Sequence, residues 1–291
     1  MSEMSQQGSS IAALINTDRF PLHAPDTEEY RKVIGGVQQQ LAAEGSAVLT
    51  GFIAESALRR LAQEVKVLDP LAYRAVETVN AYNIDVESDL PADHPGRIQF
   101  ERGNAFVARD LIPETNGIQQ IYTSDAFQRF IADCFNMPAL YTMADPLAGL
   151  VVNVLDPGCQ HPWHFDTNSF TVSLLTQAPD VGGEFEYVPD ARAPGAENFA
   201  EIYGIISGTN DEKVRRLDLL PGDLQLFQGR FALHRVAPVA GQRGRHSVIF
   251  AYCDRPGVLS KPERSRQLFG RILPVHHDPS LIDAGADALL D

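Results

Sequence analysis

The sequence has little of what marks secreted, disulfide-bonded or membrane proteins. Its three cysteines, Cys134, Cys159 and Cys253, lie far apart and form no CxxC pair, so neither a disulfide framework nor a thiolate zinc site is indicated. No stretch approaches the ~20 apolar residues of a membrane span, and residues 1–10 lack the basic and apolar regions of a signal peptide. We therefore expect a cytoplasmic protein that does not enter a membrane.

Basic residues are also scarce. Lysine and arginine number 24 against 38 aspartates and glutamates, which gives a formal net charge of -14. Such a charge repels polyanions at long range, so we expect a small-molecule substrate and no nucleic-acid partner. Nothing in the composition indicates an oligomeric state.

The first half of the chain carries mainly helical patterns. Apolar residues recur at helical spacing over 27–43, 56–68 and 124–135, and the short apolar run 47–52 is typical of a strand. The loop at 90–103 is rich in proline and glycine, a composition found both in lids over sites and in plain connections. These patterns predict a helical N-terminal region.

The second half changes to short strand-like runs separated by turns, at 149–155, 170–176, 183–188, 218–220, 224–227 and 247–252. Runs of this kind predict an antiparallel sandwich or barrel.

With 44% hydrophobic residues in 291, the chain can bury one large core. The expected organisation is a flexible N-terminus (1–20), a mainly helical region with a lid-like loop (21–146), a β core that carries the chemistry (147–256) and a C-terminal extension (257–291). Together they form one catalytic domain of α+β class.

The most informative motif is His164-Phe165-Asp166, followed by a second histidine, His234. Residues two apart on a strand point to the same side, so His164 and Asp166 can face one metal ion while Phe165 packs behind them. Two imidazoles and one carboxylate on one face of an octahedral ion leave the opposite face open, an arrangement typical of non-haem iron oxygenases. An isolated HxD pair is more often a local hydrogen-bonding pair, with His234 capping a loop.

Two further residues, which follow His234 in the sequence, favour the metal site over the local hydrogen-bonding pair. Arg245 and Ser247 share one face of a predicted strand, where a guanidinium and a hydroxyl suit the distal carboxylate of 2-oxoglutarate.

These residues resemble the iron(II)- and 2-oxoglutarate-dependent dioxygenase superfamily, whose core is a double-stranded β-helix, a jelly roll of cupin-like form. The resemblance covers about 148–252 and is carried by the triad, Arg245 and Ser247, together with Asn153, Asp156-Pro157-Gly158, Gly182-Gly183-Glu184, Pro221-Gly222-Asp223, His234-Arg235-Val236 and Pro238-Val239. It implies that His164, Asp166 and His234 bind Fe(II), and that Arg245, Ser247 and Asn153 contact 2-oxoglutarate. A strand asparagine such as Asn153 can instead merely satisfy backbone groups.

The segment 161–166 and the stretches that follow it resemble, more narrowly, a branch of radical halogenases and hydroxylases of free amino acids. In some members of that branch, glycine replaces the metal-binding carboxylate and opens a place for chloride. Asp166 is present here. The resemblance therefore implies an oxidoreductase that uses O2 to hydroxylate a free amino acid or an amino-acid derivative and releases succinate and CO2. Desaturation or ring closure would use the same site.

Candidate substrate contacts surround the motif: His161, Trp163, Thr167, Asn168 and, in the proline-rich loop, Arg97. Each has a plain alternative. His161 can be a solvent-facing loop residue, Trp163 can pack under the barrel, Thr167 and Asn168 can form a turn, and Arg97 can be a solvated loop charge. The pair His276 and His277 has no evident partner ligand, so we expect no metal there.

Two other functions fit parts of the sequence. A nucleic-acid demethylating oxygenase uses the same iron chemistry, but it should offer a basic stripe and aromatic stacking platforms, whereas this chain is acidic and has one tryptophan. The second is a non-catalytic jelly-roll protein that binds a metal or a small acid. The presence of the triad together with Arg245 argues against it. The sequence identifies neither the substrate nor the carbon attacked.

Overall fold

A computed structural model describes residues 11–84, 90–278, 280 and 289–290, and all that follows refers to these residues. Its largest sheet has six strands in the order β1 (Ser46–Leu49), β12 (Leu224–Phe227), β8 (Thr171–Gln177), β15 (Arg245–Phe250), β6 (Leu150–Leu155) and β4 (Ala105–Val107). Every neighbouring pair is antiparallel. The N-terminal half thus supplies both edge strands, β1 and β4, of a sheet whose centre comes from the second half.

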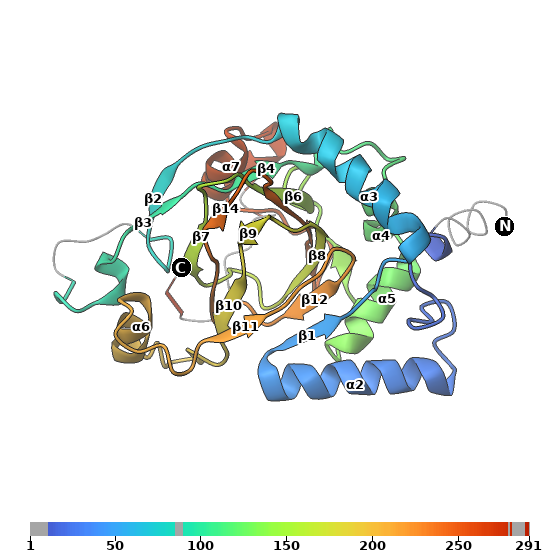
Figure 1. Cartoon of the computed structure of the whole chain (residues 1–291), viewed down its shortest axis with the longest axis horizontal. Coiled ribbons are helices and arrows are strands. Elements are labelled where there is room, and N and C mark those ends of the chain that lie inside the picture. Colours follow the sequence, from blue (N-terminus) through green and yellow to red (C-terminus); the bar gives the residue numbers. More distant parts are fainter. Residues whose placement is uncertain (1–10, 85–89, 279, 281–288, 291) are drawn as a thin grey trace.

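A second sheet has four antiparallel strands in the order β11 (Arg215–Leu217), β10 (Phe185–Val188), β13 (Leu233–Val236) and β7 (His161–His164). Three two-stranded ribbons complete the strands: β14 (Val239–Ala240) with β9 (Val181–Gly182), β16 (Tyr252–Cys253) with β5 (Tyr141–Thr142), and β2 (Glu77–Val79) with β3 (Phe100–Arg102). Figure 1 shows the strands of both large sheets arranged around one central region.

Helices cover the outer side of the six-stranded sheet. They are α2 (Glu28–Glu44), α3 (Glu55–Leu68), α4 (Gly117–Tyr122) and α5 (Asp125–Cys134), beside β1, β12 and β8 in Figure 1. Two further helices, α6 (Phe199–Ile206) and α7 (Pro262–Phe269), lie on other sides of the strands. Single 3-10 turns are η1 (Asp69–Leu71), η2 (Pro95–Arg97), η3 (Arg109–Leu111) and η4 (Pro274–His277).

The sequence determines where α2 begins and ends. The Thr27 hydroxyl accepts a hydrogen bond from the Tyr30 N–H (3.2 Å) at the N-cap, where that N–H has no partner inside the helix. Gly45 ends the helix in the left-handed conformation (φ 65°), which glycine adopts without steric cost. Between them one face is buried: Tyr30, Ile34, Val37 and Leu41.

The alternation of side chains along the strands separates the core from a pocket. On β15, Val248 and Phe250 join the cluster formed with the helices, whereas Arg245, Ser247 and Ile249 line a cavity on the other face. β6 repeats this pattern, because Val152 packs toward the helices and its neighbours face the cavity. Since successive side chains on a strand point to opposite faces, one strand serves both the core and the site.

Most expected elements are present, with boundaries shifted by a few residues. The prediction of a strand over 218–220 is wrong: the strand is β11, at Arg215–Leu217. Residues 220–223 form a turn instead, in which the Asp223 carboxylate accepts the Leu220 N–H (2.9 Å). The sequence patterns also missed helices α4, α6 and α7 and the short strands β2, β3, β4, β5 and β14. Residues 85–89, just before the lid-like loop at 90–103, and residues 1–10 of the expected flexible N-terminus lie outside the described residues.

None of the helices in the described part of the chain combines the length and the apolar character that crossing a bilayer requires.

Candidate metal and cosubstrate site

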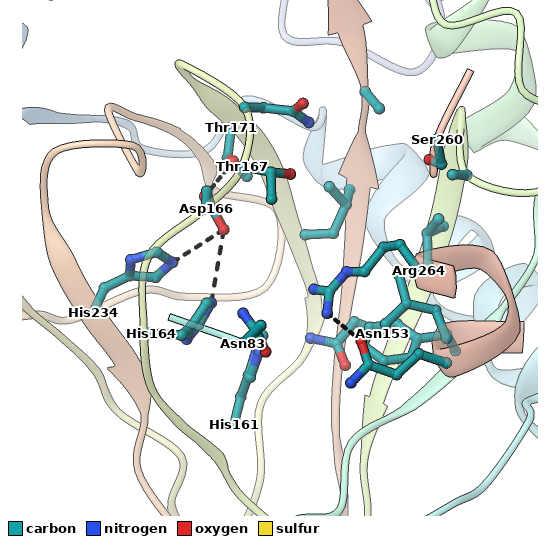
Figure 2. Close-up of a pocket in the computed structure, with 18 of the residues that line it drawn as sticks. Asn83, Asn153, His161, His164, Asp166, Thr167, Thr171, His234, Ser260 and Arg264 are labelled. Atoms are coloured by element: carbon teal, nitrogen blue, oxygen red, sulfur yellow. Dashed lines mark hydrogen bonds and ion pairs between the residues drawn. The ribbon is translucent and has the colours of Figure 1, made fainter. Parts of the chain in front are cut away.

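Strand pairing brings the two histidines of the motif together. His164 ends β7 and lies directly opposite His234 on β13, and Asp166 follows two residues after His164. The carboxylate Oδ1 of Asp166 is 3.7 Å from His164 Nε2 and 3.4 Å from His234 Nε2. One potential ligand atom from each residue lies within 4.8 Å of the other two, and Figure 2 shows the three side chains pointing toward one another. The predicted triad therefore converges in space.

Both imidazole rings are oriented by the backbone. His164 Nδ1 lies 2.8 Å from the Pro162 carbonyl and His234 Nδ1 lies 3.0 Å from the Ala232 carbonyl. A carbonyl only accepts, so each Nδ1 carries the hydrogen, and each Nε2 keeps its lone pair for a metal. Such outer partners hold metal-binding histidines in one tautomer and orientation. The sequence alone could not name these two carbonyls.

The two oxygens of Asp166 have different surroundings. Oδ1 faces the histidines, while Oδ2 accepts a hydrogen bond from the Thr171 hydroxyl (2.6 Å). The backbone N–H of Asp166 donates to the Gly229 carbonyl (3.1 Å). A Cβ on Gly229 would lie 1.9 Å from Oδ2, so this position accepts only glycine without displacing the carboxylate.

The protonation states fit metal binding. Burial lowers the pKa of His164 to about 3, and the neighbouring His234 adds to the effect. Burial alone would raise the pKa of Asp166, but His234, His164 and the Thr171 hydroxyl together hold it well below its ordinary value. At neutral pH His164 is therefore neutral and Asp166 ionised, the states that metal ligands require. The donor set of two imidazoles and one carboxylate suits ferrous iron.

The predicted cosubstrate residues lie on one wall of the same cavity. Arg245 donates to the Ser247 hydroxyl (3.2 Å), and Ser247 is paired across the strands with Asn153. Burial lowers the pKa of Arg245 to about 10, so the guanidinium stays charged at neutral pH. In the described part of the chain it makes no ion pair, and a buried guanidinium without a carboxylate is costly.

A cavity of about 1110 Å³ joins the triad to this wall. Besides the residues above, its lining includes Asn83, Phe199, Ser260 and Arg264. A space of this size lies above the usual range for small-molecule pockets, so it can hold a cosubstrate and a further small molecule together.

Three of the five predicted substrate contacts line this cavity: His161, Thr167 and Asn168. The His161 ring stacks on the His164 ring, with centroids 3.8 Å apart. Burial, followed by the neighbouring His164 and Arg102, lowers the pKa of His161 well below its ordinary value.

The structure places the other two predicted contacts elsewhere. Trp163 is buried on the opposite side of β7, where the Arg235 guanidinium lies 4.6 Å from the centre of its ring. Arg97 is exposed and donates to the Leu90 carbonyl (2.7 Å). Neither lines the cavity, which corrects the expectation for both. The cause is strand alternation for Trp163 and a local loop hydrogen bond for Arg97.

Sequence reasoning missed four residues that shape the site: Asn83, Thr171, Gly229 and Arg264. Thr171 and Gly229 touch Asp166, and Arg264 reaches into the cavity from α7 (Figure 2). The glycine of Gln228-Gly229-Arg230, shortly before His234, could have indicated a close approach of the backbone to the site. Nothing in the pattern of α7 indicated that Arg264 faces the site.

A model of the family described as Halogenase D (HalD) matches residues 28–262. The chain belongs to this family. The match spans the helices α2 to α5, both large sheets, the triad and Arg245, and it ends just before Arg264. No curated protein sequence is similar enough to serve as a relative.

Solved structures show the same fold. The epimerase SnoN from nogalamycin biosynthesis has a TM-score of 0.53 at 13% identity, with 77% of this chain and 84% of that chain covered. AviO1 from Streptomyces viridochromogenes Tue57 has a TM-score of 0.52 at 15% identity, with 76% and 95% covered. A prolyl hydroxylase from Trichoplax adhaerens, solved with a peptide of hypoxia inducible factor, has a TM-score of 0.51 at 18% identity, with 84% and 98% covered.

The family match, the fold and the buried triad confirm the resemblance read from the sequence. The protein is an enzyme of the iron(II)- and 2-oxoglutarate-dependent oxygenase superfamily, with iron and 2-oxoglutarate as its cofactors.

Proposed function

We propose that this HalD family member hydroxylates an unactivated C–H bond of a small molecule, a free amino acid or an amino-acid derivative. On this proposal the two sheets form a double-stranded β-helix, residues 147–256 are its catalytic part, and the helical region and the C-terminal extension pack on it as one domain. The observation that carries the proposal is Asp166, a metal-binding carboxylate at the position where halogenases of the resembling branch have glycine.

Iron with 2-oxoglutarate and O2 supplies the oxidation of a C–H bond, coupled to release of succinate and CO2. His164, Asp166 and His234 would hold the metal on one face. Asp166 would take, with Oδ1, the place on the metal that a halide needs, and the Thr171 hydroxyl donates to the other oxygen.

Arg245 and Ser247 would hold the distal carboxylate of 2-oxoglutarate. Their position on the inner face of β15 puts a fixed guanidinium in the triad's own cavity, and a guanidinium binds a carboxylate through two parallel hydrogen bonds. Asn153, on the paired strand, would contact the same molecule. His161, Thr167 and Asn168 lie on the cavity wall and would help to orient the substrate.

The test is a panel of free amino acids incubated with the protein, ferrous iron, 2-oxoglutarate and air in chloride-containing buffer. We expect succinate release coupled to a product that gains one oxygen atom and no chlorine. The matched control is Asp166→Gly, which should lose hydroxylation. A chlorinated product from the unaltered protein would refute the assignment, and so would full activity of the variant.

A further inference from the structure

We propose that Arg264, on helix α7, binds a carboxylate of the substrate, so that the molecule accepted beside 2-oxoglutarate is itself an acid. This inference rests on the proposed function and deepens it. It assigns a second anion-binding group to the cavity, distinct from Arg245.

The contacts of Arg264 leave most of its hydrogen-bonding capacity unused. Within the described residues its guanidinium makes one hydrogen bond, to Gln267 Oε1 (2.7 Å), and no ion pair. A guanidinium has five N–H donors in a planar fork suited to carboxylates. Figure 2 shows Arg264 extending from α7 into the cavity, across from His234. Its free donors therefore face the space where a substrate would lie.

A comparison with Arg102 shows that this lack of a partner is not general. Arg102 is buried, and it forms an ion pair with Glu77. Burial, followed by the charge of Arg102, lowers the pKa of Arg264 to about 10, so both guanidiniums are charged at neutral pH. Glu77 balances one of these two neighbouring charges, and the other is left for an anion from outside the chain.

The charges of the loaded site lead to the same conclusion. The two positive charges of ferrous iron and that of Arg245 balance Asp166 and the two carboxylates of 2-oxoglutarate. Arg264, which is half-buried, is then left with a positive charge that no group of the site balances, and an unpaired charge partly withdrawn from water is unfavourable. The exposed side chains of Lys261 and Glu263, on the same segment, carry opposite charges and leave this excess unchanged. A carboxylate on the substrate would pair with this guanidinium directly.

The experiment measures discrimination between an acid and its uncharged counterpart. Under anaerobic conditions, the visible absorption band of the protein with ferrous iron and 2-oxoglutarate is titrated with each protein amino acid. Each is used as the free acid and as the carboxamide. For the amino acid that perturbs the band most strongly, we expect the carboxamide to need about 10- to 100-fold higher concentration for the same effect, the loss typical of a charge-assisted hydrogen bond.

Four variants test whether Arg264 causes this difference. Arg264→Gln should bring the ratio between acid and carboxamide close to unity, because the interaction energy of a pair disappears when one partner is removed. Arg264→Lys should retain part of it. Gln267→Glu should lower the ratio while leaving Arg264 in place, since the new carboxylate would occupy its donors. Arg266→Gln, an exposed arginine on the same helix, is the matched control and should keep the full ratio.

The outcomes separate this inference from the proposed function. Absence of the band with ferrous iron and 2-oxoglutarate would overturn the proposed function and, with it, the role given to Arg264. A normal band would overturn the role of Arg264 alone if the acid and the carboxamide were equivalent, or if their ratio were unchanged in Arg264→Gln. A higher 2-oxoglutarate requirement in Arg264→Gln, with the acid unaffected, would reassign Arg264 to the cosubstrate. By comparison, we expect Arg245→Ala to raise the concentration of 2-oxoglutarate that the protein requires.

Discussion

Asp166 is held at one oxygen and closely approached by the backbone. The Thr171 hydroxyl occupies Oδ2, and Gly229 lies so close that even one added carbon would meet the carboxylate. A carboxylate restrained in this way presents Oδ1 alone toward the histidines. The hydrogen bond and the close backbone therefore favour a ligand that binds through one oxygen and leaves the remaining positions of the metal open.

Gly229→Ala should weaken metal binding. The new Cβ would meet Asp166 Oδ2 at 1.9 Å, so the carboxylate must move away from the two Nε2 atoms. Outer groups that orient metal ligands typically contribute about 10- to 100-fold to affinity, and we expect a loss of that size. Titration of the metal-free protein with ferrous or cobaltous ion under anaerobic conditions measures it.

The matched control for that variant is Gly35→Ala on α2. A Cβ there meets nothing within 4 Å, and alanine is favoured over glycine in a helix by roughly 0.5–1 kcal/mol. This variant should bind the metal like the unaltered protein and be slightly more stable. Equal metal affinity in Gly229→Ala and Gly35→Ala would show that the glycine does not position Asp166.

At the scale of elements, one buried carboxylate joins three segments around α7. Asp145 is fully buried, and its Oδ1 accepts the N–H groups of Leu147 (2.7 Å) and Ala148 (3.0 Å). Oδ2 accepts the Ser260 N–H (3.0 Å) and lies 3.0 Å from His276 Nε2. Asp145 thus ties the start of the core strands to the segment that leads into α7 and to η4.

His276→Ala should destabilise the protein by on the order of 3 kcal/mol, since the fully buried Asp145 carboxylate would lose its imidazole partner. The neighbouring His277 is exposed, and His277→Ala should change stability by less than about 0.5 kcal/mol. Urea unfolding of both variants measures the difference. Similar values for the two would show that the contact between Asp145 and His276 contributes nothing to the fold.

The core strands and helix α7 differ in how far the sequence predicts them. The triad was predictable because alternation on a strand places His164 and Asp166 on one side. Alternation also put Arg245 and Ser247 on one face. Arg264 was not predictable, since helix α7 is short and its orientation depends on contacts made by Asp145, far away in the sequence.

The whole molecule combines a large negative charge with histidines buried in the fold. The net charge of -14 and a pI of about 4.9 mean that acidification reduces self-repulsion. His246 acts in the opposite direction. It is buried on the outer face of β15, 3.6 Å from Asp69, and burial lowers its pKa. His161 and His164, also lowered by burial, add to this effect in the metal-free protein.

We expect the histidines to dominate when salt removes the repulsion. At 1 M salt the screening length is about 3 Å, so self-repulsion contributes little. Below about pH 6.5, the ordinary pKa of histidine, these histidines bind protons in the unfolded chain but stay neutral in the folded protein. Stability present at pH 7 is therefore lost as the pH falls, by up to about 1.4 kcal/mol per pH unit for each such histidine. Urea unfolding of the metal-free protein in 1 M salt, between pH 7 and 5.5, should show this loss. His246→Gln should reduce its slope whatever the variant's stability at pH 7. A stability that rises toward pH 5.5 in high salt, or a slope unchanged by the variant, would contradict the role given to the buried histidines.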